Sequence, residues 1–149
     1  HPSVKWGIGI VSEKVIDRVN ILEATKLAMQ KAVKNLGSKM KEAEPLSLEP
    51  LSFEVRPQLI DFLILDGNFK INSVIPQKSI VKADEKVFSC ALASIIAKVT
   101  RDRLMLKYDK KYPQYGFDKH KGYPTRFHRA MLNKYGRCAI HRNSFHYQS

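Results

Sequence analysis

The chain of 149 residues has the length of one domain, and its hydrophobic content of 44% is ordinary for a globular protein. No apolar run approaches the roughly 20 residues that cross a bilayer, and the two cysteines lack Cys-x-x-Cys spacing, so we expect a cytoplasmic protein without membrane spans or a disulfide framework. Lysine and arginine outnumber aspartate and glutamate by 26 to 14. The net charge of +12 favours a polyanionic partner, although a solvated basic surface has the same composition.

The first third of the chain predicts a strand and a helix. Residues 4–11 alternate between apolar and small or polar side chains, which predicts a short strand. Residues 20–36 carry apolar side chains at helical spacing, and Asn20 with Glu23 three residues later resembles a capping box. Gly37 is expected to end this helix.

The middle of the chain predicts two strands and a long helix. Residues 38–57 contain three prolines and scattered charges, which indicate a long surface loop or insertion. Residues 59–65 are apolar except for Asp61, as is typical of a strand covered on both faces. Residues 79–82 predict a second, shorter strand, and a helical pattern follows from about residue 85 to residue 108.

One carboxylate follows each predicted strand. Asp66 comes directly after the first and Asp84 after the second, at the ends where open α/β sheets place their ligands. Two carboxylates that converge there can share a hard divalent cation. The structural alternatives are a turn made by Asp66 with Gly67 and Asn68, and an N-cap role for Asp84.

A basic, aromatic loop is predicted over residues 112–123, before a short helix that begins after Thr125 and ends at Gly136. Interleaved rings and cations suit nucleic acid, although such rings more often pack inside a large loop. Three basic side chains of the long helix are either a phosphate-facing stripe or a solvated face, with the solvated face the default: Lys98, Arg101 and Arg103. A zinc site would need side chains whose spacing matches no recognised zinc pattern: His120, His128, Cys138, His141 and His146.

Six short motifs together resemble the ribonuclease HII family, in the family's own order and over nearly the whole chain. They are residues 16–25, residues 65–68 (Leu-Asp-Gly-Asn), residues 82–84 (Lys-Ala-Asp), residues 93–103, residues 112–125, and His141 and Arg142 with Ser144 and Phe145. One such tetrapeptide would be weak evidence, but six in order at suitable spacing are strong.

The resemblance implies an α/β protein with a ribonuclease H-like mixed sheet flanked by helices and a helical C-terminal part. It also implies a monomeric endonuclease that uses Mg²⁺ or Mn²⁺ to hydrolyse the RNA strand of RNA/DNA hybrids and to nick at ribonucleotides embedded in duplex DNA. By position, Asp66 and Asp84 would be catalytic, metal-binding carboxylates. Tyr123 would pack on the sugar beside the scissile junction, and Lys121 and Gly122 would bind the substrate with it.

The sequence departs from the family at one motif. The family's Asp-Glu-x-Gly-Arg-Gly segment does not occur in residues 1–149, where the only Asp-Glu pair is Asp84 and Glu85. We therefore expect residues 1–149 to be a partial domain whose first strands are absent, which is inactive alone and leaves residues 4–11 as an exposed sheet edge. The alternative is a non-catalytic, basic module that binds nucleic acid.

Overall fold

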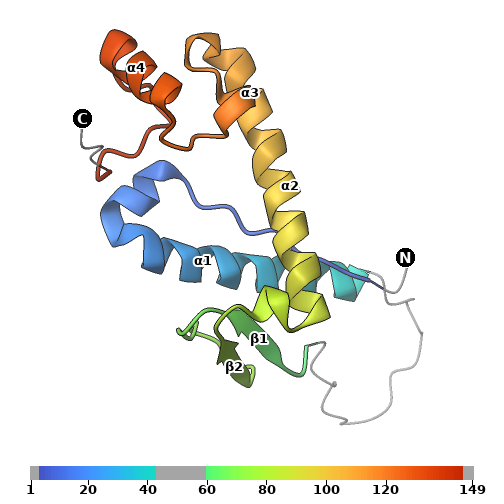
Figure 1. Cartoon of the computed structure of the whole chain (residues 1–149). Helices are drawn as coiled ribbons and strands as arrows, with labels where there is room; N and C mark the ends of the chain where they lie inside the picture. The colour runs from blue at the N-terminus through green and yellow to red at the C-terminus, as the bar shows by residue number, and fades with distance from the viewer. Residues whose placement is uncertain (1–3, 43–59, 146–149) are drawn as a thin grey trace, which may run out of the picture.

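The computed structural model describes residues 4–42 and 60–145, which form four α-helices, two short 3₁₀ helices and one small sheet (Figure 1). In chain order the elements are α1 (Glu13–Glu42), β1 (Leu63–Asp66), β2 (Gln77–Ile80), η1 (Ala83–Glu85), α2 (Phe88–Lys111), η2 (Pro113–Tyr115), α3 (Phe117–His120) and α4 (Arg126–Tyr135). The sheet lies beside α1, and α2 runs from there to α3 and α4 at the far end. The predicted α/β class with a helical C-terminal part is confirmed. None of the described helices is long and apolar enough to span a membrane.

β1 and β2 pair in parallel, with Leu63 opposite Gln77 and Asp66 opposite Ile80. Both predicted strands exist, but each is displaced by a few residues from its predicted range. Along β1, buried and exposed residues alternate, so the prediction of a strand covered on both faces is wrong. In the described part of the chain, α1 covers one face, where Met29 and Val33 pack against the cluster of buried apolar residues.

The helix α1 bends at Asn20. It begins at Glu13, earlier than predicted, and Asn20 interrupts it with a φ of 71°. The Asn20 Oδ1 accepts hydrogen bonds from the backbone N–H groups of Leu22 and Glu23, at 2.9 and 3.1 Å, so the side chain caps the longer second part of α1. Gly37 does not end the helix, which runs on to Glu42 and takes the beginning of the predicted loop; residues 43–59 lie outside the described residues.

Residues 4–11 form no strand, contrary to the prediction, because no strand of the described chain lies beside them. They run along α1 instead. Two of their glycines touch its backbone: a Cβ added at Gly7 would lie 2.1 Å from the Ala32 carbonyl oxygen, and one at Gly9 would lie 1.8 Å from that of Ala28. Alternate carbonyl groups of the segment accept hydrogen bonds from α1 side chains: Trp6 from Lys39, Ile8 from Asn35 and Ile10 from Lys31.

A second cluster of buried side chains lies in the C-terminal part. Tyr115 and Phe117 stack with ring centroids 5.5 Å apart, and the Tyr115 hydroxyl donates to the Gly136 carbonyl oxygen at 2.9 Å. The helix α4 begins and ends as predicted, since the Thr125 side chain accepts from the N–H of His128 and Gly136 follows the last turn. Tyr115 and Gly136 thereby fasten the end of α4 to η2.

We expect Gly9→Ala to lower the free energy of unfolding by about 1–3 kcal/mol, because the new methyl group would overlap the α1 backbone. Gly37→Ala is the matched control: no atom lies within 4 Å of an added Cβ there, and in a helix interior the change should stabilise by about 0.5–1 kcal/mol. Urea unfolding followed by circular dichroism measures both. Equal effects of the two substitutions would contradict the close approach of the segment to α1.

Candidate active site

The first predicted site residue, Asp66, ends β1. Its Oδ1 accepts a hydrogen bond of 2.9 Å from the backbone N–H of Ala83, which is fully buried at the start of η1. The N–H of Gly67 donates to the Ile80 carbonyl oxygen at 3.0 Å and so extends the strand pairing by one residue. The Asp66 carboxylate therefore joins the carboxyl ends of both strands to η1 while remaining exposed.

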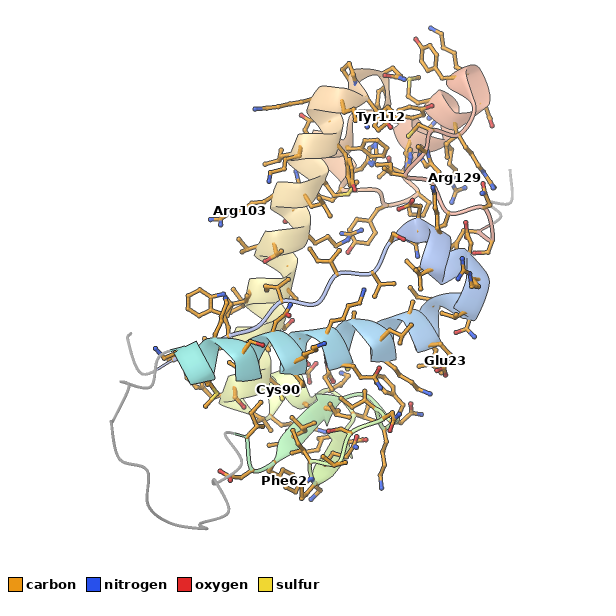
Figure 2. All side chains as sticks on the ribbon, turned by 180° about the vertical axis from the view of Figure 1, so that it is seen from behind. Glu23, Phe62, Cys90, Arg103, Tyr112 and Arg129 are labelled. Atoms are coloured by element: carbon orange, nitrogen blue, oxygen red, sulfur yellow. The ribbon has the colours of Figure 1, made fainter. Side chains whose placement is uncertain are left out.

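Asp84 lies in η1, one residue beyond the backbone group that Asp66 binds. The N-cap interpretation of Asp84 is wrong, because α2 begins only at Phe88 and its N-cap position is Val87, with no side-chain cap. Burial and the negative charges of Asp66 and Asp84 raise the pKa of the Cys90 thiol in the first turn of α2, so both carboxylates lie within electrostatic reach of the same side chain. Figure 2 shows Cys90 where α2 starts beside α1 and the sheet.

The two carboxylates are of the chemical kind that binds Mg²⁺ or Mn²⁺, but they are too few for a complete site. Asp66 and Asp84 offer exposed carboxylate oxygens, which hard divalent cations prefer, and each ion needs about six ligands in all. Within residues 4–42 and 60–145, no group of three or more His, Cys, Asp or Glu side chains is placed to hold a metal ion. The two carboxylates are therefore too few to hold two divalent ions by themselves.

The predicted substrate-binding residues lie in a tight loop after α3. Lys121 and Gly122 both have positive φ angles, 50° and 83°. The N–H of Tyr123 donates to the His120 carbonyl oxygen and the N–H of Thr125 to the Tyr123 carbonyl oxygen, both at 2.8 Å. These backbone bonds hold the loop, in which Tyr123 is 58% exposed.

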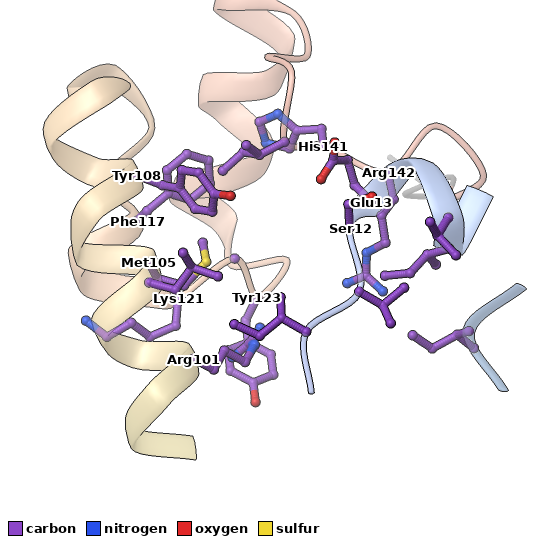
Figure 3. Close-up of a pocket in the computed structure, with 18 of the residues that line it drawn as sticks. Ser12, Glu13, Arg101, Met105, Tyr108, Phe117, Lys121, Tyr123, His141 and Arg142 are labelled. Carbon is purple, nitrogen blue, oxygen red and sulfur yellow. The ribbon is translucent and has the colours of Figure 1, made fainter. Parts of the chain in front are cut away.

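Arg101 of α2 is the main partner of the Tyr123 ring. Its guanidinium lies over that ring, 4.8 Å from the centroid, and Figure 3 shows the two side chains together. Arg101 is exposed, as the solvated-face interpretation predicts, but its guanidinium also contacts the Tyr123 ring. Lys98 pairs with Asp102 at 3.4 Å, and Arg103 is exposed. The sequence alone could not reveal this role, because the loop that Arg101 meets is more than 20 residues away in the chain.

A cleft of about 740 Å³ lies between the start of α1, the middle of α2 and the C-terminal loops. Its charged lining is mostly positive, with Lys31, Arg101, Lys121 and Arg142 against Glu13. Gly122 and Tyr123 line it too, but Asp66 and Asp84 do not. The structure thus brings the three residues that were predicted to bind substrate to one cleft. The two carboxylates lie near the other end of α2, beside the sheet.

The side chains considered for zinc do gather, apart from His146, which lies outside the described residues. Their ring nitrogens, however, bind one another and the backbone. His128 Nε2 lies 3.1 Å from His141 Nε2, and His141 Nδ1 lies 3.1 Å from the Cys138 sulfur. His120 stacks on His128, with centroids 4.2 Å apart. The cluster lies directly beneath the Tyr123 loop.

The parallel strand pair with carboxylates at its carboxyl edge, followed by a helical C-terminal part, belongs to the ribonuclease H-like class of α/β folds. A family model described as Ribonuclease HII matches residues 4–148. The chain belongs to the ribonuclease HII family.

Curated relatives agree with the family model. A ribonuclease HII of Chlamydia caviae is 48% identical over 97% of this chain and 58% of its own length. One of Chlorobaculum parvum is 45% identical over 94% of this chain and 59% of its own length, and one of Acetivibrio thermocellus is 50% identical over 93% and 46%. The chain therefore spans about half to three-fifths of these relatives.

Asp17, near the start of α1, binds the closing motif of the chain. Its carboxylate accepts hydrogen bonds from the N–H of Asn143 at 2.8 Å and from the N–H and hydroxyl of Ser144 at 2.9 and 2.6 Å. The side-chain and backbone bonds of Ser144, then that of Asn143, lower the pKa of Asp17 below its ordinary 3.8. The first part of α1 and the closing motif of the chain are thus held together by one carboxylate.

We expect Asp17→Asn to lower the Tm at neutral pH, because an amide cannot accept all three hydrogen bonds. Since the folded-state pKa of Asp17 is lowered, its contribution is complete well above pH 3.8 and is lost as the pH falls below that value. The Tm difference between the two proteins should therefore shrink in acid. Asp61→Asn, at an exposed carboxylate, is the control, and an equal Tm loss in that variant would contradict the role of Asp17.

Proposed function

We propose that this chain is part of a metal-dependent endonuclease that hydrolyses the RNA strand of RNA/DNA hybrids and nicks at ribonucleotides embedded in duplex DNA. The observation that carries the proposal is the position of Asp66 at the carboxyl end of β1 and of Asp84 in η1, which follows the neighbouring parallel strand β2. Membership of the ribonuclease HII family supports the reaction. We also propose that the protein acts as a monomer in the cytoplasm.

In this proposal Asp66 and Asp84 hold Mg²⁺ or Mn²⁺ and are the catalytic carboxylates. A bound divalent ion would activate the attacking water and neutralise charge on the leaving oxygen. Asp66 is oriented by the Ala83 N–H, which binds Oδ1, so Oδ2 is the oxygen that we propose as the metal ligand. The pair needs further carboxylates, and the Asp-Glu-x-Gly-Arg-Gly motif that would supply them does not occur in residues 1–149.

The cleft supports the substrate part of the proposal. Lys121 and Arg101 place positive charge beside the exposed Tyr123 ring, which suits a phosphate backbone next to a sugar. Gly122 lets the loop approach Met105 of α2, because a Cβ there would lie 3.3 Å from the Met105 methyl group at a φ of 83°. The 2′-hydroxyl is the group that distinguishes RNA from DNA at such a sugar.

Residues 1–149 alone should show no ribonuclease activity above background, because two carboxylates are too few for two divalent ions. Fusing a segment with the Asp-Glu-x-Gly-Arg-Gly motif in front of His1 should produce Mg²⁺- or Mn²⁺-dependent cleavage of a labelled duplex with one ribonucleotide. In that fusion Asp66→Asn or Asp84→Asn should cost at least about a hundredfold in rate, since even outer partners of metal ligands cost about 10- to 100-fold.

The control for this experiment is Glu85→Gln, which removes a carboxylate next to Asp84 that is paired with Lys82 at the surface. It should leave cleavage nearly unchanged. Robust cleavage by residues 1–149 alone, or a fusion indifferent to both aspartate substitutions, would overturn the assignment of Asp66 and Asp84. A fusion that binds the duplex without cutting it would favour the non-catalytic module.

Replacing Tyr123 with Ala should reduce activity of the fusion on a single embedded ribonucleotide by about tenfold, a loss typical of one aromatic stacking contact. The loss on a long RNA/DNA hybrid should be smaller, because cleavage at a single ribonucleotide depends most on contact with that one sugar. The kcat/KM on both substrates measures the difference, with Tyr135→Ala, an exposed tyrosine on α4 outside the cleft, as the control. Equal losses on both substrates would contradict the role of Tyr123.

A further inference from the structure

The proposed nuclease function does not use the histidines beneath the Tyr123 loop, although they are among the most buried polar side chains described. His128 is 1% exposed and His120 is 7% exposed. Each ring binds the backbone of the loop. The direction of these hydrogen bonds can be derived, because backbone N–H groups only donate and carbonyl oxygens only accept.

The chain of bonds starts at Cys138. Its backbone N–H donates to His141 Nδ1 at 2.9 Å, so this nitrogen carries no proton and the neutral ring has its proton on Nε2. His141 Nε2–H therefore donates to His128 Nε2, 3.1 Å away. His128 in turn has its proton on Nδ1 and donates to the Tyr123 carbonyl oxygen at 3.0 Å. Every bond points from Cys138 toward Tyr123.

His120 is fixed in the same way. The N–H of Gly122 donates to His120 Nδ1 at 3.1 Å, so His120 Nε2–H donates to the Tyr115 carbonyl oxygen at 2.7 Å. His120 and His128 thus bind consecutive residues of the loop, one through an N–H and the other through a carbonyl group. The stacking of the two rings fixes their relative position.

We propose that His128 and His141 are positioning residues that set the Tyr123 ring for substrate through this directed chain, which exists only while both rings are neutral. This inference deepens the proposed function and rests on it for the role of Tyr123. Protonation of His141 would put an Nδ1–H against the Cys138 N–H. Protonation of His128 would put an Nε2–H against the His141 Nε2–H. Either change replaces a hydrogen bond by two facing donors, and the Cys138 sulfur, 3.1 Å from His141 Nδ1, is only a weak acceptor for the new proton.

The surroundings also keep the rings neutral. Burial is the main cause that lowers the pKa of both His128 and His141 below the ordinary 6.5. The charge of His120 lowers the pKa of His128 further, and the charges of His128, Arg137 and His120 do so for His141, while the backbone hydrogen bonds with Tyr123 and Cys138 act in the opposite direction. Titratable and charged groups surround the pair in the described part of the chain. Those that line the same cleft are Glu13 and Lys31 from α1, Arg101 and Tyr108 from α2, Lys121, and Arg142. Tyr115, His120, Arg137 and Cys138 contact the two rings or act on them electrostatically, and Asp17 binds Asn143, two residues after His141. Positive groups outnumber the two carboxylates.

The first experiment needs no nucleic acid. Nitrogen-15 NMR of the 149-residue chain at neutral pH should show His128 protonated at Nδ1 and His141 and His120 at Nε2. As the pH falls through the lowered pKa values of His128 and His141, the nuclear Overhauser contact between the Tyr123 ring and the Arg101 side chain should disappear with their titration. A His128 protonated at Nε2 at neutral pH, or a Tyr123–Arg101 contact that survives protonation, would overturn the proposal.

Two variants of His128 separate its two nitrogens. In His128→Asn the amide NH₂ takes the place of Nδ1–H and can still donate to the Tyr123 carbonyl oxygen. In His128→Gln the amide reaches only toward His141. We expect His128→Gln to lose the Tyr123–Arg101 contact and His128→Asn to recover it. The wild-type spectra decide the question independently if either variant fails to fold.

The binding experiment separates this inference from the proposed function. At one fixed salt concentration, the affinity for a duplex with one ribonucleotide is compared with that for the same all-deoxy duplex. The preference should fall by about three- to tenfold in His128→Gln, the effect of one lost hydrogen bond, and should recover in His128→Asn. If Tyr123→Ala leaves the preference unchanged, the substrate role of Tyr123 fails, whereas the protonation sites and the Tyr123–Arg101 contact still decide the positioning inference.

Discussion

The hydrogen bond from the Ala83 N–H to Asp66 Oδ1 is the contact on which the rest of the arrangement depends. It fixes the end of β1 against η1, and only two residues separate η1 from the start of α2. The direction of α2 in turn determines where Arg101 meets the Tyr123 loop. A bond to a charged acceptor is stronger than a neutral one, and here it also leaves Asp66 exposed at the sheet edge. One carboxylate thus serves the fold and the proposed metal site together.

The second constraint is backbone geometry around Tyr123. Lys121 and Gly122 have positive φ angles, which for a lysine costs energy that the surrounding bonds must offset. The bonds that do so come from the backbone and from His120 and His128, both of which are neutral in the derived arrangement. Because the histidines bind the backbone of the loop, the Tyr123 ring need not be buried to hold the loop in place.

The sequence predicted those features whose causes are local. Thr125 and Gly136 define α4 because capping acts within one turn, and Asp66 lies at the end of β1 because it directly follows an apolar run. Prediction from the sequence failed where the local structure depends on a partner far away in the chain. Residues 4–11 have a strand pattern but rest on α1, whose side chains bind alternate carbonyl groups in place of a neighbouring strand. Gly37 continues a helix because nothing nearby requires a left-handed turn. The contact of Arg101 with the Tyr123 ring arises only when the chain is folded.

The distribution of charge around the cleft has two opposed consequences. The positive lining of the cleft favours a phosphate backbone, and the charge of Arg137 adds to the burial that disfavours protonation of His141. A bound phosphate would reverse this effect, since an anion nearby favours the charged form of a histidine. Because His128 is only 1% exposed, a protonated ring there would lack hydration, and a phosphate at the surface would not supply it. Burial therefore limits how far a bound phosphate can favour protonation of His128. Burial of the pair is therefore what would make a basic cleft that binds substrate, as proposed, compatible with a histidine chain that must stay neutral.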